Sequence, residues 1–258
     1  MVKRFYTLFI FIFFAFVLTA CGTKDTEATG VAYGMTYNDY LTAATVEVKG
    51  EVVTSAALDE YYLPNTWAKV KVLETDAPAD VLVSGSSWYG KFIKIGDKNF
   101  TASLREDPLE IGGVTYNNQV VKYSAEGVDD LFTWLRASEE NRKWYVEQLD
   151  NNNAWVAKDD FSKSTYETAG QVDSNGKLGF SKGKTNYWKG DNFPLGWSGN
   201  MSELVKVVKG TKMDASMDQI TQNEDKKWVV NGIVSGATYV SFKEYYSVLK
   251  TAYDKAVG

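Results

Sequence analysis

Between Tyr40 and Leu63 apolar and polar side chains alternate, and this pattern constrains the fold more than any other part of the chain. In its first half, Ala44, Val46 and Val48 alternate with Thr45, Glu47 and Lys49. The Lys49-Gly50 pair then predicts a tight turn into a second extended segment from Val52 to Leu58. The chain should therefore contain an antiparallel hairpin with one buried face.

Other segments extend this picture of short strands joined by turns. Lys91–Ile95 and Asn99–Ala102 predict a second hairpin, and Val114–Tyr123 predicts a further strand. Lys227–Val234 predicts one or two short strands, interrupted by the favoured turn pair Asn231-Gly232.

Three regions have the spacing of amphipathic helices. Val128, Leu131, Trp134 and Leu135 share one face, and Ser138 is placed to cap a second helix directly after it. Capping-box spacing at Asn200–Glu203 and again at Ser241–Glu244 predicts a helix running to Gly210 and a last helix that keeps one apolar face to the C-terminus. The expected fold class is α+β, with antiparallel hairpins and packed helices.

The N-terminus has the features of an export signal. Lys3 and Arg4 precede an apolar run from Phe5 to Val17, which is too short to span a membrane comfortably. The run ends in Leu18-Thr19-Ala20-Cys21, which resembles the lipobox of bacterial lipoproteins and implies a lipid such as palmitate on Cys21. A generic signal peptide followed by a buried cysteine is the alternative.

The expected organisation follows from this signal. Residues 1–20 are the signal peptide, residues 21–33 a flexible tether, and residues 34–258 an α+β domain on the extracytoplasmic face of the cell membrane. Loss of Lys3 and Arg4 changes the formal net charge from −5 to −7, which disfavours nucleic acid as a partner.

Composition narrows the chemistry. The chain has no histidine, so serine–histidine triads and histidine metal sites are excluded. The acidic pairs Asp59-Glu60, Asp129-Asp130 and Glu139-Glu140 lack the spacing of a calcium loop. Neither catalytic residues nor a metal site are expected. The 8 Trp, 16 Tyr and 13 Phe could stack on a ligand or simply form the core.

One segment suits a phosphate. Ser235-Gly236-Ala237-Thr238 follows a predicted strand and precedes the last helix. Its small residues permit close backbone approach, and a helix N-terminus favours negative charge. A phosphate attached to the Thr238 hydroxyl would need no catalytic base. The alternative is an ordinary turn in which Thr238 and Ser241 satisfy backbone donors.

This segment resembles the Ser/Thr-Gly-Ala-Thr motif of the FMN-binding domain family, found in exported bacterial electron-transfer proteins. The residues from Ala44 to Tyr61 resemble the opening strands of that family. The resemblance implies an FMN-binding scaffold with a long insertion at about residues 64–215. It also implies FMN joined through a phosphoester to Thr238 by a separate flavin transferase, with Ser235, Gly236, Ala237 and Asn231 contributing to the cofactor site.

One position departs from the family motif. The aspartate that the family carries three residues before the Ser/Thr is Gly232 here, and Asn231 lies one residue earlier. Two functions therefore remain as expectations. The first is a membrane-anchored flavoprotein that carries electrons to an unidentified redox partner and is more a carrier than an enzyme. The second is a surface lipoprotein without cofactor that acts as a ligand-binding or structural module.

Overall fold

A computed structural model describes residues 26–37, 39–72, 78–170, 172, 179–185, 187, 189–190 and 194–258. Within these residues the chain is a mixed α+β protein with several small antiparallel sheets and six helices. This confirms the expected class. The signal peptide, Cys21 and residues 22–25 lie outside the described residues. Among the residues that are described, no helix is long and apolar enough to cross a membrane.

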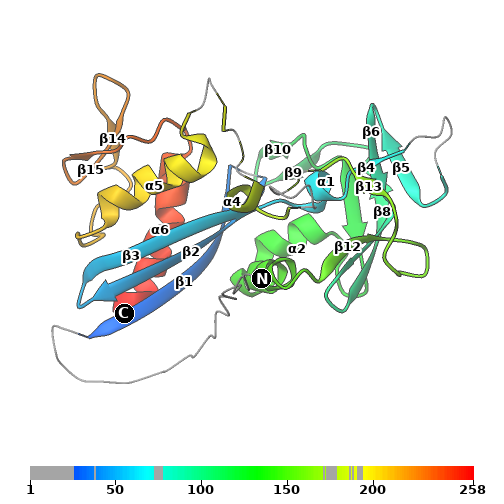
Figure 1. Cartoon of the computed structure of the whole chain (residues 1–258), viewed down its shortest axis with the longest axis horizontal. Helices are drawn as coiled ribbons and strands as arrows, with labels where there is room; N and C mark the ends of the chain where they lie inside the picture. The colour runs from blue at the N-terminus through cyan, green and yellow to red at the C-terminus, as the bar shows by residue number, and fades with distance from the viewer. Residues whose placement is uncertain are drawn as a thin grey trace, which may run out of the picture.

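The elements gather in two lobes (Figure 1). A long three-stranded antiparallel sheet is the main element of the first lobe. Its strands are β1 (Glu27–Thr36), β2 (Tyr40–Lys49) and β3 (Val52–Tyr61), in the order β1-β2-β3. The β2–β3 hairpin is the one predicted from side-chain alternation, with Gly50 at a φ of +61° in its turn. Val46 and Val48 are buried, whereas Glu47 and Lys49 are exposed.

The predicted tether is wrong from Glu27 onward, because this segment is strand β1 and pairs with β2 along its whole length. The small, polar and charged residues up to about Gly30 suited a flexible linker, but Gly30 and Gly34 have a packing role. In the structure they permit close packing of α6 (Phe242–Val257) over the strand. A Cβ on Gly30 would lie 1.8 Å from the carbonyl oxygen of Ala252, and one on Gly34 would lie 2.5 Å from Val248 Cγ2.

The first hydrophobic core lies between this sheet and the C-terminal helices. The last helix begins and continues as predicted, and its buried face is Phe242, Tyr245, Tyr246, Val248, Leu249, Ala252 and Tyr253. Ser241 does not form the predicted capping box, because the Glu244 carboxylate accepts the backbone N–H of Tyr37 instead.

The helix α5 (Gly196–Val208) packs beside β3 and completes this core. The capping box predicted at Asn200 is wrong, because α5 begins at Gly196 and Asn200 lies inside it. A small sheet of β14 (Thr221–Gln222), β15 (Trp228–Val230) and β16 (Ile233–Val234) follows. The predicted Asn231-Gly232 turn joins its last two strands, with φ values of +50° and +77°.

The second lobe holds the middle of the chain and has its own core (Figure 1). Its largest sheet has the order β11-β8-β7-β12 and includes the predicted hairpin of β7 and β8. The expected strand at 114–123 is instead two strands in different sheets, β10 and β11. The strands of the second lobe are β4 (Val70–Lys71), β5 (Val81–Ser84), β6 (Ser87–Gly90), β7 (Phe92–Ile95), β8 (Lys98–Leu104), β9 (Leu109–Ile111), β10 (Val114–Tyr116), β11 (Val121–Ser124), β12 (Ala154–Ala157) and β13 (Glu167–Thr168).

Three helices belong to this lobe, namely α1 (Pro64–Trp67), α2 (Leu131–Ala137) and α3 (Glu139–Asp150). The predicted cap of α3 is confirmed, since Ser138 Oγ accepts the N–H of Asn141 at 3.1 Å. The short helix α4 (Lys182–Thr185) lies at the junction of the lobes (Figure 1).

The boundary of the second lobe differs from the expected insertion. Apart from Leu41 of β2, its buried core residues run from the end of β3 to Phe180, whereas α5, Met213 and Ala215 pack in the core of the first lobe. The middle lobe therefore ends well before residue 215.

Candidate functional site

The Ser235–Thr238 segment connects β16 to α6 and is docked onto α5. Ser235 is buried, and its hydroxyl donates to the carbonyl oxygen of Glu203 at 3.2 Å. The same hydroxyl accepts the N–H of Ala237 at 3.1 Å. Ala237 is buried as well, so the middle of the segment is fixed against the helix.

Thr238 is held by one side chain of α5 and remains exposed. Its N–H donates to Asn200 Oδ1 at 2.7 Å, and its hydroxyl donates to the same oxygen at 3.2 Å. The Asn200 amide nitrogen donates to the carbonyl oxygen of Gly196 at 2.7 Å, which fixes the orientation of the amide. The threonine hydroxyl is thus presented at the surface on a braced backbone.

A cavity of about 400 Å³ opens beside Thr238. This volume lies in the range of small-molecule sites, which are typically mostly apolar with a few placed polar groups. Aromatic rings supply much of its wall. The lining residues are Tyr37, Tyr40, Lys182, Gly196, Trp197, Asn200, Met201, Thr238, Tyr239, Val240, Ser241 and Tyr245.

Two buried polar atoms on residues lining the cavity lack hydrogen-bond partners within the described part of the chain. Trp197 is 3% exposed, and its Nε1 is buried without a hydrogen-bond partner within the described residues. The Tyr239 hydroxyl oxygen is also buried without a partner. Unpaired buried polar groups are uncommon and costly, so they indicate a place where a ligand or water supplies the missing partner.

A charged group lies behind one wall of the cavity, at the end of β3. Glu60 is fully buried, and its Oε1 accepts the hydroxyl of Thr36 at 2.5 Å and that of Tyr245 at 2.7 Å. Thr36 and Thr42 are joined in turn by a hydroxyl contact of 2.6 Å. The other oxygen of Glu60 forms an ion pair with Lys182 Nζ.

Lys182 is the cation that lines the cavity. Its Nζ lies 3.6 Å from the centroid of the Tyr40 ring and 5.0 Å from that of Tyr187. Burial lowers the pKa of Lys182 from its ordinary value, and the Glu60 carboxylate opposes this shift. Burial also raises the pKa of Tyr40, so this ring stays neutral beside the ammonium group.

The other predicted site residues lie apart from the cavity. Gly236 is exposed, and a Cβ there would lie 2.4 Å from Glu203 Oε2, so glycine leaves room for this carboxylate. Asn231 is exposed in the β15–β16 turn and donates to Asp214 Oδ1 at 3.2 Å. Of the five predicted cofactor-site residues, only Thr238 lines the cavity.

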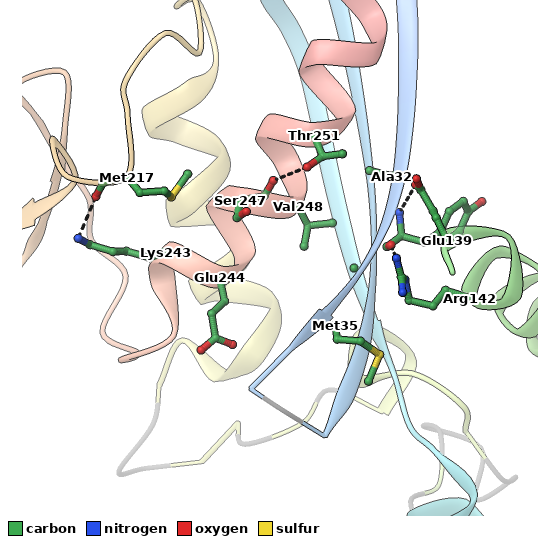
Figure 2. Close-up of a pocket in the computed structure, with 12 residues that line it drawn as sticks. Ala32, Met35, Glu139, Arg142, Met217, Lys243, Glu244, Ser247, Val248 and Thr251 are labelled. Atoms are coloured by element: carbon green, nitrogen blue, oxygen red, sulfur yellow. Dashed lines mark hydrogen bonds between the residues drawn. The ribbon is translucent and has the colours of Figure 1, made fainter. Parts of the chain in front are cut away.

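A second cavity, of about 470 Å³, lies between β1, α3 and α6 (Figure 2). Its charged side chains bind backbone atoms of the chain itself. Glu139 accepts the N–H of Tyr33 at 2.9 Å, and Arg142 Nε donates to the carbonyl oxygen of Tyr33 at 2.7 Å. Lys243 Nζ donates to the carbonyl oxygen of Met217 at 2.9 Å. The two contacts to Tyr33 stabilise the edge strand β1, and all three side chains already have partners, so the Thr238 cavity is the better candidate site.

Most of the cavity lining was not predicted from the sequence. Lys182 and Tyr40 gave no local signal in the sequence. Asn200 was assigned to a cap, although its oxygen holds Thr238. No group of three or more metal-ligating side chains occurs among the residues whose positions are described.

Comparisons with known proteins add no assignment. No family model matches the chain, and no curated protein or solved structure is significantly similar to it. The candidate function therefore depends on the geometry of the site and on the motif.

Proposed function

We propose that this chain is a lipid-anchored extracytoplasmic electron carrier that binds FMN in the Thr238 cavity. One observation carries the proposal: an exposed, braced threonine hydroxyl lies at the edge of an aromatic cavity whose buried donors lack partners. The lipid on Cys21 is part of the same proposal and depends on the lipobox alone.

The residues present fit a flavin. Tyr37 and Tyr40 offer faces on which a planar ring could stack. Trp197 Nε1 and the Tyr239 hydroxyl have no hydrogen-bond partner in the described chain. Both groups can donate to the carbonyl and nitrogen acceptors of a flavin. The motif hydroxyl then lies where a ribityl phosphate could be joined to it. FMN, when bound, supplies the electron-transfer chemistry.

The protein itself would bind, orient and shield the cofactor. Asn200 fixes Thr238, and the aromatic walls would exclude water from the cofactor. Tyr37 and Val240 are exposed lining residues, so the cavity is open to the surface beside them. No histidine is available as a general base, which suits a carrier better than a catalyst.

The alternative is a cofactor-free binding module, and Gly232 is the observation that favours it. The position that carries aspartate in the family lies here in a tight turn with a φ of +77°, where a side chain other than glycine is strained. If the transferase requires that aspartate, Thr238 would stay unmodified. The cavity could then hold a planar ligand without a covalent bond.

The test is the intact mass of the mature chain after co-expression with a flavin transferase. The expected mass increase is that of FMN less one water, retained after denaturation. Thr238→Ala should abolish it, whereas Thr221→Ala, an exposed threonine on β14, should leave it unchanged. A wild-type chain without adduct that nevertheless quenches added FMN would favour non-covalent binding, and a chain that does neither would exclude the flavin proposal.

A further inference from the structure

A buried ion pair lies at the junction of the two lobes, against the Thr238 cavity. The side chains of Lys182 and Glu60 are 2% and 0% exposed, and they come from α4 and β3. Burying two charges removes them from water, and their mutual attraction often fails to compensate. Apolar residues could fill the same space, so the pair calls for an explanation other than stability.

The pair is oriented. Lys182 lines the cavity, whereas Glu60 is not among the lining residues and accepts hydrogen bonds from the hydroxyls of Thr36 and Tyr245. The nearby rings of Tyr40 and Tyr245 exclude solvent from this wall. The positive end of the pair therefore faces whatever occupies the cavity, with little water to screen it.

We infer that Lys182 raises the reduction potential of a redox-active ring bound in this cavity, and this rests on the proposed flavin function. When the ring accepts two electrons and one proton from an external reductant, it gains one negative charge. An ammonium group facing the ring stabilises this form over the neutral oxidised form. Glu60 positions the ammonium and partly offsets its charge.

The effect is measured as a shift in the two-electron midpoint potential of the flavin-loaded chain. A tenfold change in the preference for the reduced form corresponds to about 30 mV for a two-electron couple. We expect the Lys182→Met/Glu60→Gln double variant to have a potential lower by at least that amount. This variant removes both charges together and leaves no unpaired buried carboxylate.

Two further variants separate electrostatics from folding. Glu60→Gln alone removes the carboxylate that opposes the ammonium, and at a pH low enough to keep Lys182 protonated it should raise the potential. Lys184→Met is the matched control, because Lys184 is on the same helix but is half exposed and paired with Asp150 at 2.9 Å. Its potential should equal that of the wild type.

The outcomes distinguish this inference from the function on which it rests. A wild-type chain that carries no flavin overturns both. Flavin attached to all variants, with the double variant and Glu60→Gln at the wild-type potential, overturns the role of Lys182 alone. Opposite shifts in these two variants, with none in Lys184→Met, support it.

Discussion

Asn200 Oδ1 accepts two hydrogen bonds from Thr238, one from its N–H at 2.7 Å and one from its hydroxyl at 3.2 Å. The two residues are 38 positions apart in the chain. Their contact connects the middle of α5 to the loop before α6, so the motif is positioned by a neighbouring helix as well as by its own sequence.

Asn200→Ala removes this acceptor. Losing these hydrogen bonds should destabilise the loop by about 1–3 kcal/mol and raise the exchange rate of the Thr238 amide roughly tenfold or more. Hydrogen exchange followed by NMR measures the effect. Ser202→Ala is the control, since that hydroxyl bonds only Ser198 within the helix. An unchanged exchange rate in Asn200→Ala would show that the loop holds itself.

Asn200→Asp separates structure from charge. It keeps an oxygen acceptor for Thr238 but adds a negative charge beside the proposed phosphate. The Thr238 amide should stay protected, while flavin attachment slows, as measured by intact mass over time. Attachment at the wild-type rate would argue against a phosphate at this position.

Adjacent tyrosines on α6 should differ in their contribution to stability. Tyr245 donates to the buried Glu60 carboxylate at 2.7 Å, and a hydrogen bond to a charged group contributes about 1.5–3 kcal/mol. Tyr246 is fully buried with no partner for its hydroxyl in the described chain. Tyr245→Phe should lower the free energy of unfolding by that amount, and Tyr246→Phe should be neutral or stabilising in urea denaturation. Equal losses would contradict the assigned contacts.

Gly30→Ala tests the packing of β1 under α6. The new Cβ would lie 1.8 Å from a backbone carbonyl oxygen, which cannot rotate away, so the strand or the helix must shift. Overpacking of this kind costs about 1–3 kcal/mol, occasionally more. Gly190→Ala, with open space around its Cβ position, should change thermal stability little. A Gly30 variant as stable as this control would refute the close approach.

The chain should lose stability in alkali. Burial raises the pKa of Tyr123, Tyr145 and Tyr245, and that of Tyr246 to about 12, from an ordinary value near 10. Because the folded state retains these protons, the stabilisation is present below about pH 10 and is lost as pH rises toward the folded pKa values. The lowered pKa of Lys182 acts in the opposite direction, but it is one group against several.

The measurement is the free energy of unfolding between neutral and strongly alkaline pH, with tyrosinate absorbance recorded in parallel. Each buried tyrosine should contribute up to about 1.4 kcal/mol per pH unit above 10. Most of the absorbance should appear together with unfolding. Complete tyrosine ionisation near pH 10 in a chain that stays folded would contradict the burial.

Cys21→Ser should prevent lipid attachment, so the variant should be lost from the membrane fraction in which the wild-type chain is expected. Palmitate labelling and membrane fractionation measure this directly. Thr23→Ala, which keeps the cysteine, should remain labelled and anchored. Labelling of the Cys21 variant would place the lipid elsewhere.

Local patterns predicted the elements that local chemistry determines. Alternation around Val46 defined the β2–β3 hairpin, Asn231-Gly232 defined the last turn, and Ser138 marked the start of α3. Each signal involves residues close together in the chain, so it can be read without knowledge of the fold.

The errors concern long-range packing. The start of β1 resembled a tether because its residues are small, polar and charged, and the helix that packs on Gly30 and Gly34 comes more than 200 residues later. Lys182 could not be recognised as part of the site, since its partner Glu60 comes from another region of the chain. For the candidate site, the motif indicated Thr238, which lines the cavity, whereas the aromatic and charged walls emerged only from the tertiary structure.

If Cys21 carries the proposed lipid, the position of β1 limits the distance between the candidate site and the bilayer. A lipid on Cys21 is six residues from Glu27, a reach of at most about 20 Å. β1 then runs 10 residues, roughly 30 Å, from the end beside the C-terminus toward Tyr37 at the cavity (Figure 1). With the proposed anchor near the opposite end of the strand, the cavity would lie away from the lipid headgroups, on the side where it could meet partners in solution.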